Sequence, residues 1–121
     1  MPVTYRFDST IVVIELVGEY SMDDVRRGIL NSLADSRCPA APCILIDLNK
    51  SVSIYKRTPE DVKTMVIALS SLRERFSRIA LVAQHDLPYG LMRMGSVFSE
   101  EQGMPVEIFR TVASARTWLL S

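Results

Sequence analysis

Apolar and polar residues alternate at two periods along this chain, and the two periods divide it into strands and helices. Near the N-terminus, a period of two predicts a short strand over Val3–Phe7, which ends at the turn signal Asp8-Ser9. A continuous β-branched run then predicts a second strand over Thr10–Val17 that is buried on both faces. Because the turn is short, these two strands are expected to form an antiparallel hairpin.

Four later segments have apolar residues at helical spacing, and a side chain able to cap a helix precedes each one. Ser21 precedes the first, with two acids in its first turn. Thr58 precedes the second, and Pro59 at the first helical position makes this the strongest helix start in the chain. Asp86 is expected to cap the third helix, and Thr111 the fourth.

Three further strands alternate with these helices, over Cys43–Leu48, Arg78–Ala83 and Val106–Phe109. The predicted order is therefore ββαβαβαβα, with a polar loop from Asn49 to Arg57. Alternating strands and helices imply mainly parallel pairing with right-handed crossovers. The sequence thus predicts a single α/β domain over residues 1–121, in which helices flank a five-stranded mixed sheet.

Composition narrows the class of partner. A chain of 121 residues fits one domain and can bury a core without disulfides or metals. Its 14 basic and 14 acidic residues give zero formal charge, which argues against a nucleic-acid partner. Zero net charge also weakens the repulsion between copies, so a homodimer is one expectation.

The cysteines and the N-terminal residues bear on metal binding and on cellular location. Cys38 and Cys43 lack the CxxC spacing, so we expect inert thiols, with Cys43 buried in a strand, and no bound metal or cofactor. The N-terminal residues lack the charged and apolar regions of a signal peptide, and no apolar stretch has the length needed to cross a bilayer. We therefore expect a cytoplasmic protein.

Several stretches carry a resemblance to a known family. They are Arg78–Val82, the Tyr89–Met94 segment, and the stretch Val106–Thr111, which contains Phe-Arg at the end of a strand and is followed by Ala113–Leu119. Together with the element order, they resemble the SpoIIAA-like family, which shares its fold with the STAS domains of anti-sigma-factor antagonists. The resemblance implies the STAS-like fold over almost the whole chain, but it rests mostly on core positions.

The chain departs from those signalling relatives at one position. In anti-sigma-factor antagonists a phosphorylated serine lies in an Asp-Ser-Ser-Gly-like turn before the second helix, and no such turn precedes Pro59 here. Thr58 is the nearest hydroxyl, and its expected role is capping. A phosphate on Thr58 would meet repulsion from Glu60 and Asp61, so the phosphoserine role is not carried over.

No catalytic motif is present. The glycines form no phosphate-binding loop, and the chain has no GxSxG elbow. His85 is the only histidine, and adjacency to Asp86 does not create a catalytic triad. We therefore predict no catalytic residue and no enzyme, while an enzyme that uses His85 and Asp86 is a third alternative.

The candidate binding residues lie after the third and fourth predicted strands. Open α/β folds bind ligands at the carboxyl edge of the sheet, so these loops could form a polar rim over an apolar pocket. The alternative is that they are ordinary solvated loop residues. In the third helix, Leu87, Leu91, Met94, Val97 and Phe98 are expected to face inward and Met92 outward. The candidate residues are Tyr55, Lys56, Arg57, Thr58, His85, Tyr89, Met92 and Arg93.

Two functions fit this description. The first is a non-catalytic binding or regulatory module of the STAS-like type that recognises a partner protein or a small molecule. The second is a carrier of an apolar, lipid-like ligand in a pocket under the third helix, which has a basis in the similarity of this fold to lipid-transfer domains of the CRAL-TRIO type. A cavity under the helices would favour the carrier, whereas a fully packed core would exclude it.

Overall fold

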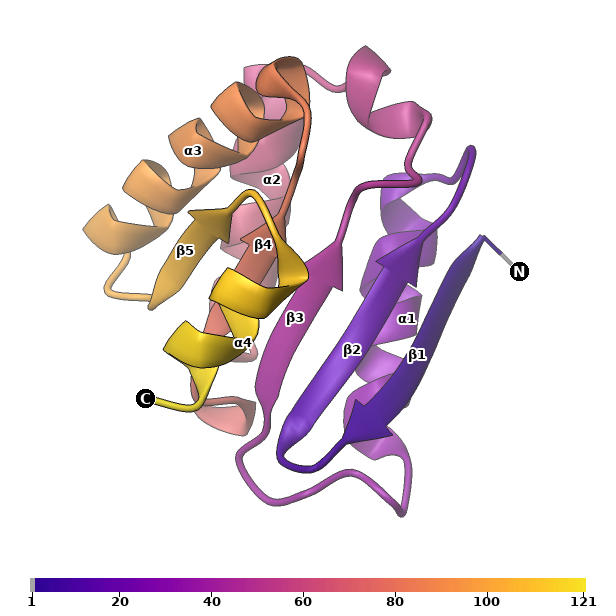
Figure 1. Cartoon of the computed structure of the whole chain (residues 1–121), viewed down its shortest axis with the longest axis vertical. Coiled ribbons are helices and arrows are strands. Elements are labelled where there is room, and N and C mark those ends of the chain that lie inside the picture. The colour runs from indigo at the N-terminus through magenta and orange to yellow at the C-terminus, as the bar shows by residue number, and fades with distance from the viewer. Residues whose placement is uncertain (1) are drawn as a thin grey trace.

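Five strands form one sheet in the order β1-β2-β3-β4-β5, and the computed structural model describes residues 2–121. The hairpin strands β1 and β2 pair antiparallel, and all later neighbours pair parallel (Figure 1). The α/β class and the mixed sheet are confirmed. The strands are β1 Val3–Asp8, β2 Ile11–Leu16, β3 Cys43–Asp47, β4 Ile79–Val82 and β5 Val106–Phe109.

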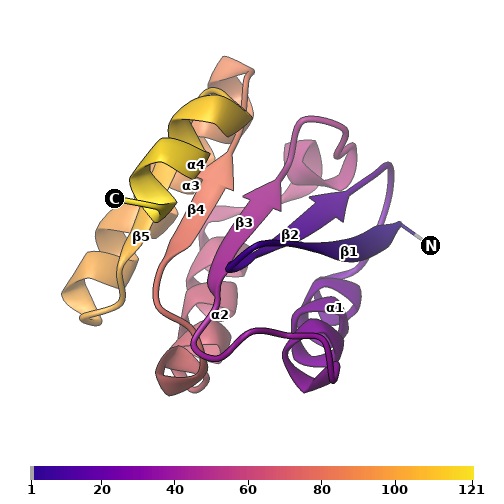
Figure 2. The ribbon, with the colours of Figure 1, turned by 60° about the horizontal axis from the view of Figure 1, so that its bottom comes forward.

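Four α-helices cover the sheet unequally. One face packs against α1, α2 and α3 and holds the larger apolar core, while the other packs against α4 alone. Figure 2 shows α1 and α2 on the side of the sheet opposite α4. Two short 3-10 helices, η1 and η2, flank α2. The helices are α1 Met22–Ala34, η1 Ser53–Lys56, α2 Pro59–Ser70, η2 Arg73–Arg75, α3 Asp86–Glu101 and α4 Val112–Leu119.

Strand β2 is buried on both faces, as its β-branched run predicts. Val12 and Ile14 belong to the larger core, and Ile11 and Val13 to the smaller one. Cys43 is buried in the smaller core as a free thiol. Because successive side chains of a strand point to opposite faces, β2 contributes residues to the apolar cores on both sides of the sheet.

Three of the four predicted caps are confirmed. Ser21 and Thr58 each accept a hydrogen bond from the backbone N–H three residues on, in a complete capping box, and Thr111 accepts from Ser114. The prediction for Asp86 was wrong, because His85 occupies the N-cap position of α3 and gives no side-chain cap. The Asp86 carboxylate instead forms an ion pair with Arg110, which directly follows β5 in the chain.

The predicted inward face of α3 was right only in part, because Leu91 and Phe98 pack against the larger core while Leu87, Met94 and Val97 are exposed. Met92 is buried at 9 % exposure, whereas Met94 is 48 % exposed. The buried positions are Pro88, Met92, Gly95 and Ser99, which recur at helical spacing. Gly95 and Ser99 are small, so the buried face of α3 coincides only in part with its most apolar face.

The stretch between β3 and α2 is not a simple polar loop. Ser51 and Ser53 are buried beside Ile54, and η1 begins within the segment. The Ser51 hydroxyl accepts a hydrogen bond from the Ile54 backbone at 3.1 Å. Buried hydroxyls that satisfy local backbone groups let this segment fold against the core. In residues 2–121, no helix combines the length and the apolar character needed to span a bilayer.

Candidate functional site

An apolar cavity of about 90 Å³ lies in the larger core, between the sheet and α2. Its walls include Leu16 and Ile46 from the sheet, Val25 from α1, Val66 from α2 and Met92 from α3. The volume is well above the roughly 10–15 Å³ that holds one water molecule, and an apolar lining offers water few partners. The space is therefore suited to an apolar group.

The cavity exists because α2 lies further from the sheet than the other helices. The backbone of α2 has its closest neighbours in α3 and α1, while α1, α3 and α4 all approach strands closely. A Cβ atom on Gly95 would lie 2.7 Å from Cγ1 of Val62, so the missing side chain lets α3 pack closely on α2. Side chains alone bridge the space from α2 to the sheet.

Methionines make up an unusual share of the cavity wall. Met22, Met65, Met92 and Met104 line it, which is four of the six methionines in the chain. A methionine side chain is unbranched and changes rotamer at low cost, so it adapts to the shape of a neighbour. The methionines therefore give the cavity a wall whose shape depends on flexible side chains.

Three polar residues, Tyr20, Arg57 and Asp61, complete the lining, and we call this group the cavity mouth. The Arg57 Nη2 donates to the Tyr20 carbonyl oxygen at 2.6 Å, and its Cζ lies 5.5 Å from the centre of the Tyr20 ring. The Arg57 Nε is buried and has no hydrogen-bond partner within residues 2–121. A residue that lines the apolar space thus has a buried N–H donor without a partner.

Hydrogen bonds to two serines of the segment between β3 and α2 hold Tyr20 in place. Its hydroxyl lies 2.5 Å from Oγ of Ser51, and its backbone N–H donates to Oγ of Ser53 at 2.8 Å. Burial raises the pKa of the Tyr20 phenol, so the ring stays neutral at physiological pH. Gly18, at φ +69°, accepts backbone bonds from Val52 and Ser53 and joins the loop after β2 to this segment.

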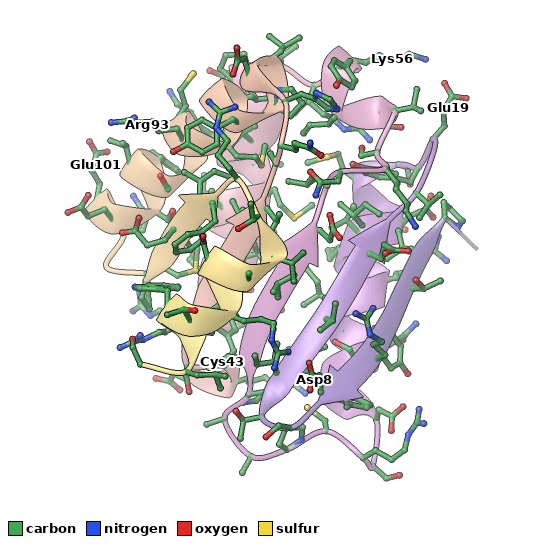
Figure 3. The ribbon with its side chains drawn as sticks, viewed as in Figure 1. Asp8, Glu19, Cys43, Lys56, Arg93 and Glu101 are labelled. Atoms are coloured by element: carbon green, nitrogen blue, oxygen red, sulfur yellow. The ribbon has the colours of Figure 1, made fainter. Side chains whose placement is uncertain are left out.

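Most of the 55–58 segment does not reach the cavity. Lys56 forms an exposed ion pair with Glu19 at 2.7 Å, and Figure 3 shows both side chains at the same edge of the sheet. The hydrogen bond from Lys56 lowers the pKa of the Glu19 carboxyl. Tyr55 is exposed, and Thr58 caps α2. Arg57 is therefore the residue of this segment that lines the cavity.

The residues after β4 form a separate cluster. The Arg110 guanidinium lies 3.9 Å from the centre of the Tyr89 ring, and its Nη1 donates to Asp86 at 2.7 Å. Tyr89 and Arg93 border a shallow groove between α3 and β5, with Arg93 pointing outward (Figure 3). His85 is exposed. These residues lie outside the cavity lining.

The structure thus brings together two of the eight candidate residues at the cavity, Arg57 and Met92. A hydrogen bond of 2.8 Å from the Gln84 backbone to Asn49 links the loops after β3 and β4, but the remaining candidates do not line the same cavity. Sequence reasoning missed Tyr20. Its position just beyond the β2 strand, at the same sheet edge as Arg57, is the signal that could have identified it.

The site contains no arrangement of metal ligands. Within residues 2–121, no three side chains of His, Cys, Asp or Glu come together in a way that could hold a metal ion. The polar side chains at the mouth are a guanidinium, a phenol and a carboxylate that accepts a backbone N–H. The guanidinium and the phenol suit hydrogen bonding to an anion or a polar group.

The comparisons with known proteins concern the fold. The chain matches no protein-family model and no curated protein. It superposes on a crystal structure of an uncharacterised DUF3478-family protein with a SpoIIAA-like fold from Shewanella loihica PV-4, with a TM-score of 0.61. The chain has the SpoIIAA-like fold. The match covers 97 % of this chain and 91 % of the other at 16 % identity, so the resemblance seen in the sequence is confirmed for the fold.

Proposed function

We propose that this domain is a ligand-binding module or carrier, rather than an enzyme, and that it takes a small apolar molecule into the cavity beneath α2. One observation carries the proposal, namely the apolar cavity in a core that is otherwise well buried. Each methylene that enters such a space from water contributes about 0.8 kcal/mol. The adaptable methionines allow a ligand larger than the resting volume.

This proposal favours the second of the two functions expected from the sequence. The cavity lies beneath α2, and α3 contributes Met92 and Gly95 to its wall. Recognition of a partner protein and formation of a homodimer remain predictions. The proposed function is reversible binding without a chemical step, and the cavity wall supplies the apolar contacts for it.

Calorimetric titration of the protein with 1-octanol tests the proposal. We expect saturable binding to the wild type, and we expect Val66→Phe to weaken it about tenfold or more, because the larger ring fills the cavity. The matched control is Val97→Phe on α3, an exposed site outside the cavity lining, which should leave the affinity unchanged. Absence of binding to the wild type would exclude the proposal, as would equal effects of the two variants.

A further inference from the structure

Arg57 supplies the cation at the cavity mouth. Its Nη2 contacts a backbone carbonyl, and no carboxylate within residues 2–121 lies at ion-pair distance from its guanidinium. Its Nε is buried, so bulk solvent does not satisfy that donor. Leaving a charged donor buried and unpaired costs free energy. An acceptor that arrived through the cavity would remove this cost.

The neighbouring polar groups already have hydrogen-bond partners. Asp61 also lines the mouth and keeps its negative charge, and its Oδ2 accepts the Thr58 backbone N–H at 2.9 Å in the capping box. Glu19 and Lys56 neutralise each other at 2.7 Å on the surface. The Nε–H of Arg57 is therefore the donor at this end of the cavity that is left without an acceptor.

The apolar cavity and Arg57 at its mouth together fit a molecule that has an apolar body and an anionic end. The unpaired Nε–H needs a hydrogen-bond acceptor, and a guanidinium binds a planar carboxylate through two parallel N–H donors. A doubly charged phosphate would need a second cation, and the nearby Lys56 is paired with Glu19. The chemistry at the mouth therefore favours a carboxylate.

We propose that the ligand is an amphiphilic carboxylic acid, whose alkyl chain fills the cavity and whose carboxylate accepts hydrogen bonds from Arg57. This inference rests on the proposed binding of an apolar molecule in the same cavity. It assigns to Arg57 the recognition of the headgroup, and to the methionine-rich wall the accommodation of the chain.

The test compares octanoate, 1-octanol and octyl phosphate by calorimetric titration at neutral pH. The wild type is expected to bind octanoate about tenfold or more tightly than 1-octanol, the range expected for a hydrogen bond to a charged group. Arg57→Met keeps an apolar stem and removes the donors, so within this variant the affinity for octanoate should no longer exceed the affinity for 1-octanol. Lys56→Met is the matched control and should keep the preference.

The outcomes separate the two proposals. If the wild type binds octanoate and 1-octanol equally, the carboxylate assignment fails and the apolar site stands. If neither ligand binds, the proposed function itself fails. Tighter, Arg57-dependent binding of octyl phosphate than of octanoate would overturn the choice of headgroup. If Arg57→Met does not fold, Arg57→Lys replaces it, and an undiminished preference for octanoate in that variant would overturn the role of Nε.

Discussion

At the scale of single residues, backbone conformation decides how the cavity mouth is held. Gly18 adopts φ +69°, a conformation that L side chains rarely adopt. Its backbone accepts bonds from Val52 and Ser53, and this junction places Tyr20 over the buried serines. Gly18, which has no side chain, thus helps to position Tyr20 at the cavity mouth.

Gly18→Ala is expected to destabilise the fold by about 1–2 kcal/mol, because an L residue with this φ is strained. No atom lies within 4 Å of the added Cβ, so the cost is conformational rather than steric. Gly90→Ala on α3 is the matched control, since its Cβ also meets nothing, and it should stabilise by roughly 0.5–1 kcal/mol. Chemical denaturation measures both, and changes of the same sign would contradict this account.

At the scale of elements, a carboxylate joins the end of α1 to the edge strand β1. Asp35 accepts a hydrogen bond from the Tyr5 hydroxyl at 2.9 Å and pairs with Arg37 at 2.8 Å. The bonds from Arg37 hold the pKa of Asp35 well below its ordinary value, and the Tyr5 hydroxyl adds to this effect. Folding therefore favours the ionised carboxylate at this junction.

This junction predicts a pH dependence. Because the pKa of Asp35 is lowered on folding, its contribution to stability is complete above the ordinary Asp pKa of about 4 and is lost as the pH falls below it. Asp35→Asn should therefore lower the melting temperature at pH 7, and the difference from wild type should shrink as the solution is acidified. Tyr5→Phe removes one bond and should show a smaller effect. A difference that is constant with pH would contradict the ionic origin.

At the scale of the whole molecule, the two faces of the sheet are packed differently. The face under α4 closes on small and branched residues such as Ala80, Val82 and Ala115, all without solvent exposure. The opposite face supports three helices, and the cavity remains between the sheet and α2. The asymmetry of the layers therefore determines where a ligand could enter.

The same asymmetry predicts that the cavity side of the sheet tolerates an added methylene and that the side beneath α4 does not. Val25→Leu places the group at the cavity wall and should change the free energy of unfolding by less than about 1 kcal/mol. Val82→Leu, in the closely packed layer beneath α4, should destabilise by about 1–3 kcal/mol through overpacking. Thermal and chemical unfolding of both variants measure this, and equal losses would indicate that the cavity does not offer free space.

Local sequence determined the elements of this protein and their order. Caps such as Ser21 and Thr58 act within one helical turn, and the alternation along β2 is itself a local pattern, so both could be predicted. Only the tertiary structure decided which face of α3 is buried, because small Gly95 allows a close approach that hydrophobicity does not register. The cavity and the unpaired Nε of Arg57 likewise arise from the distance between layers and from loops distant in sequence, which no local pattern encodes.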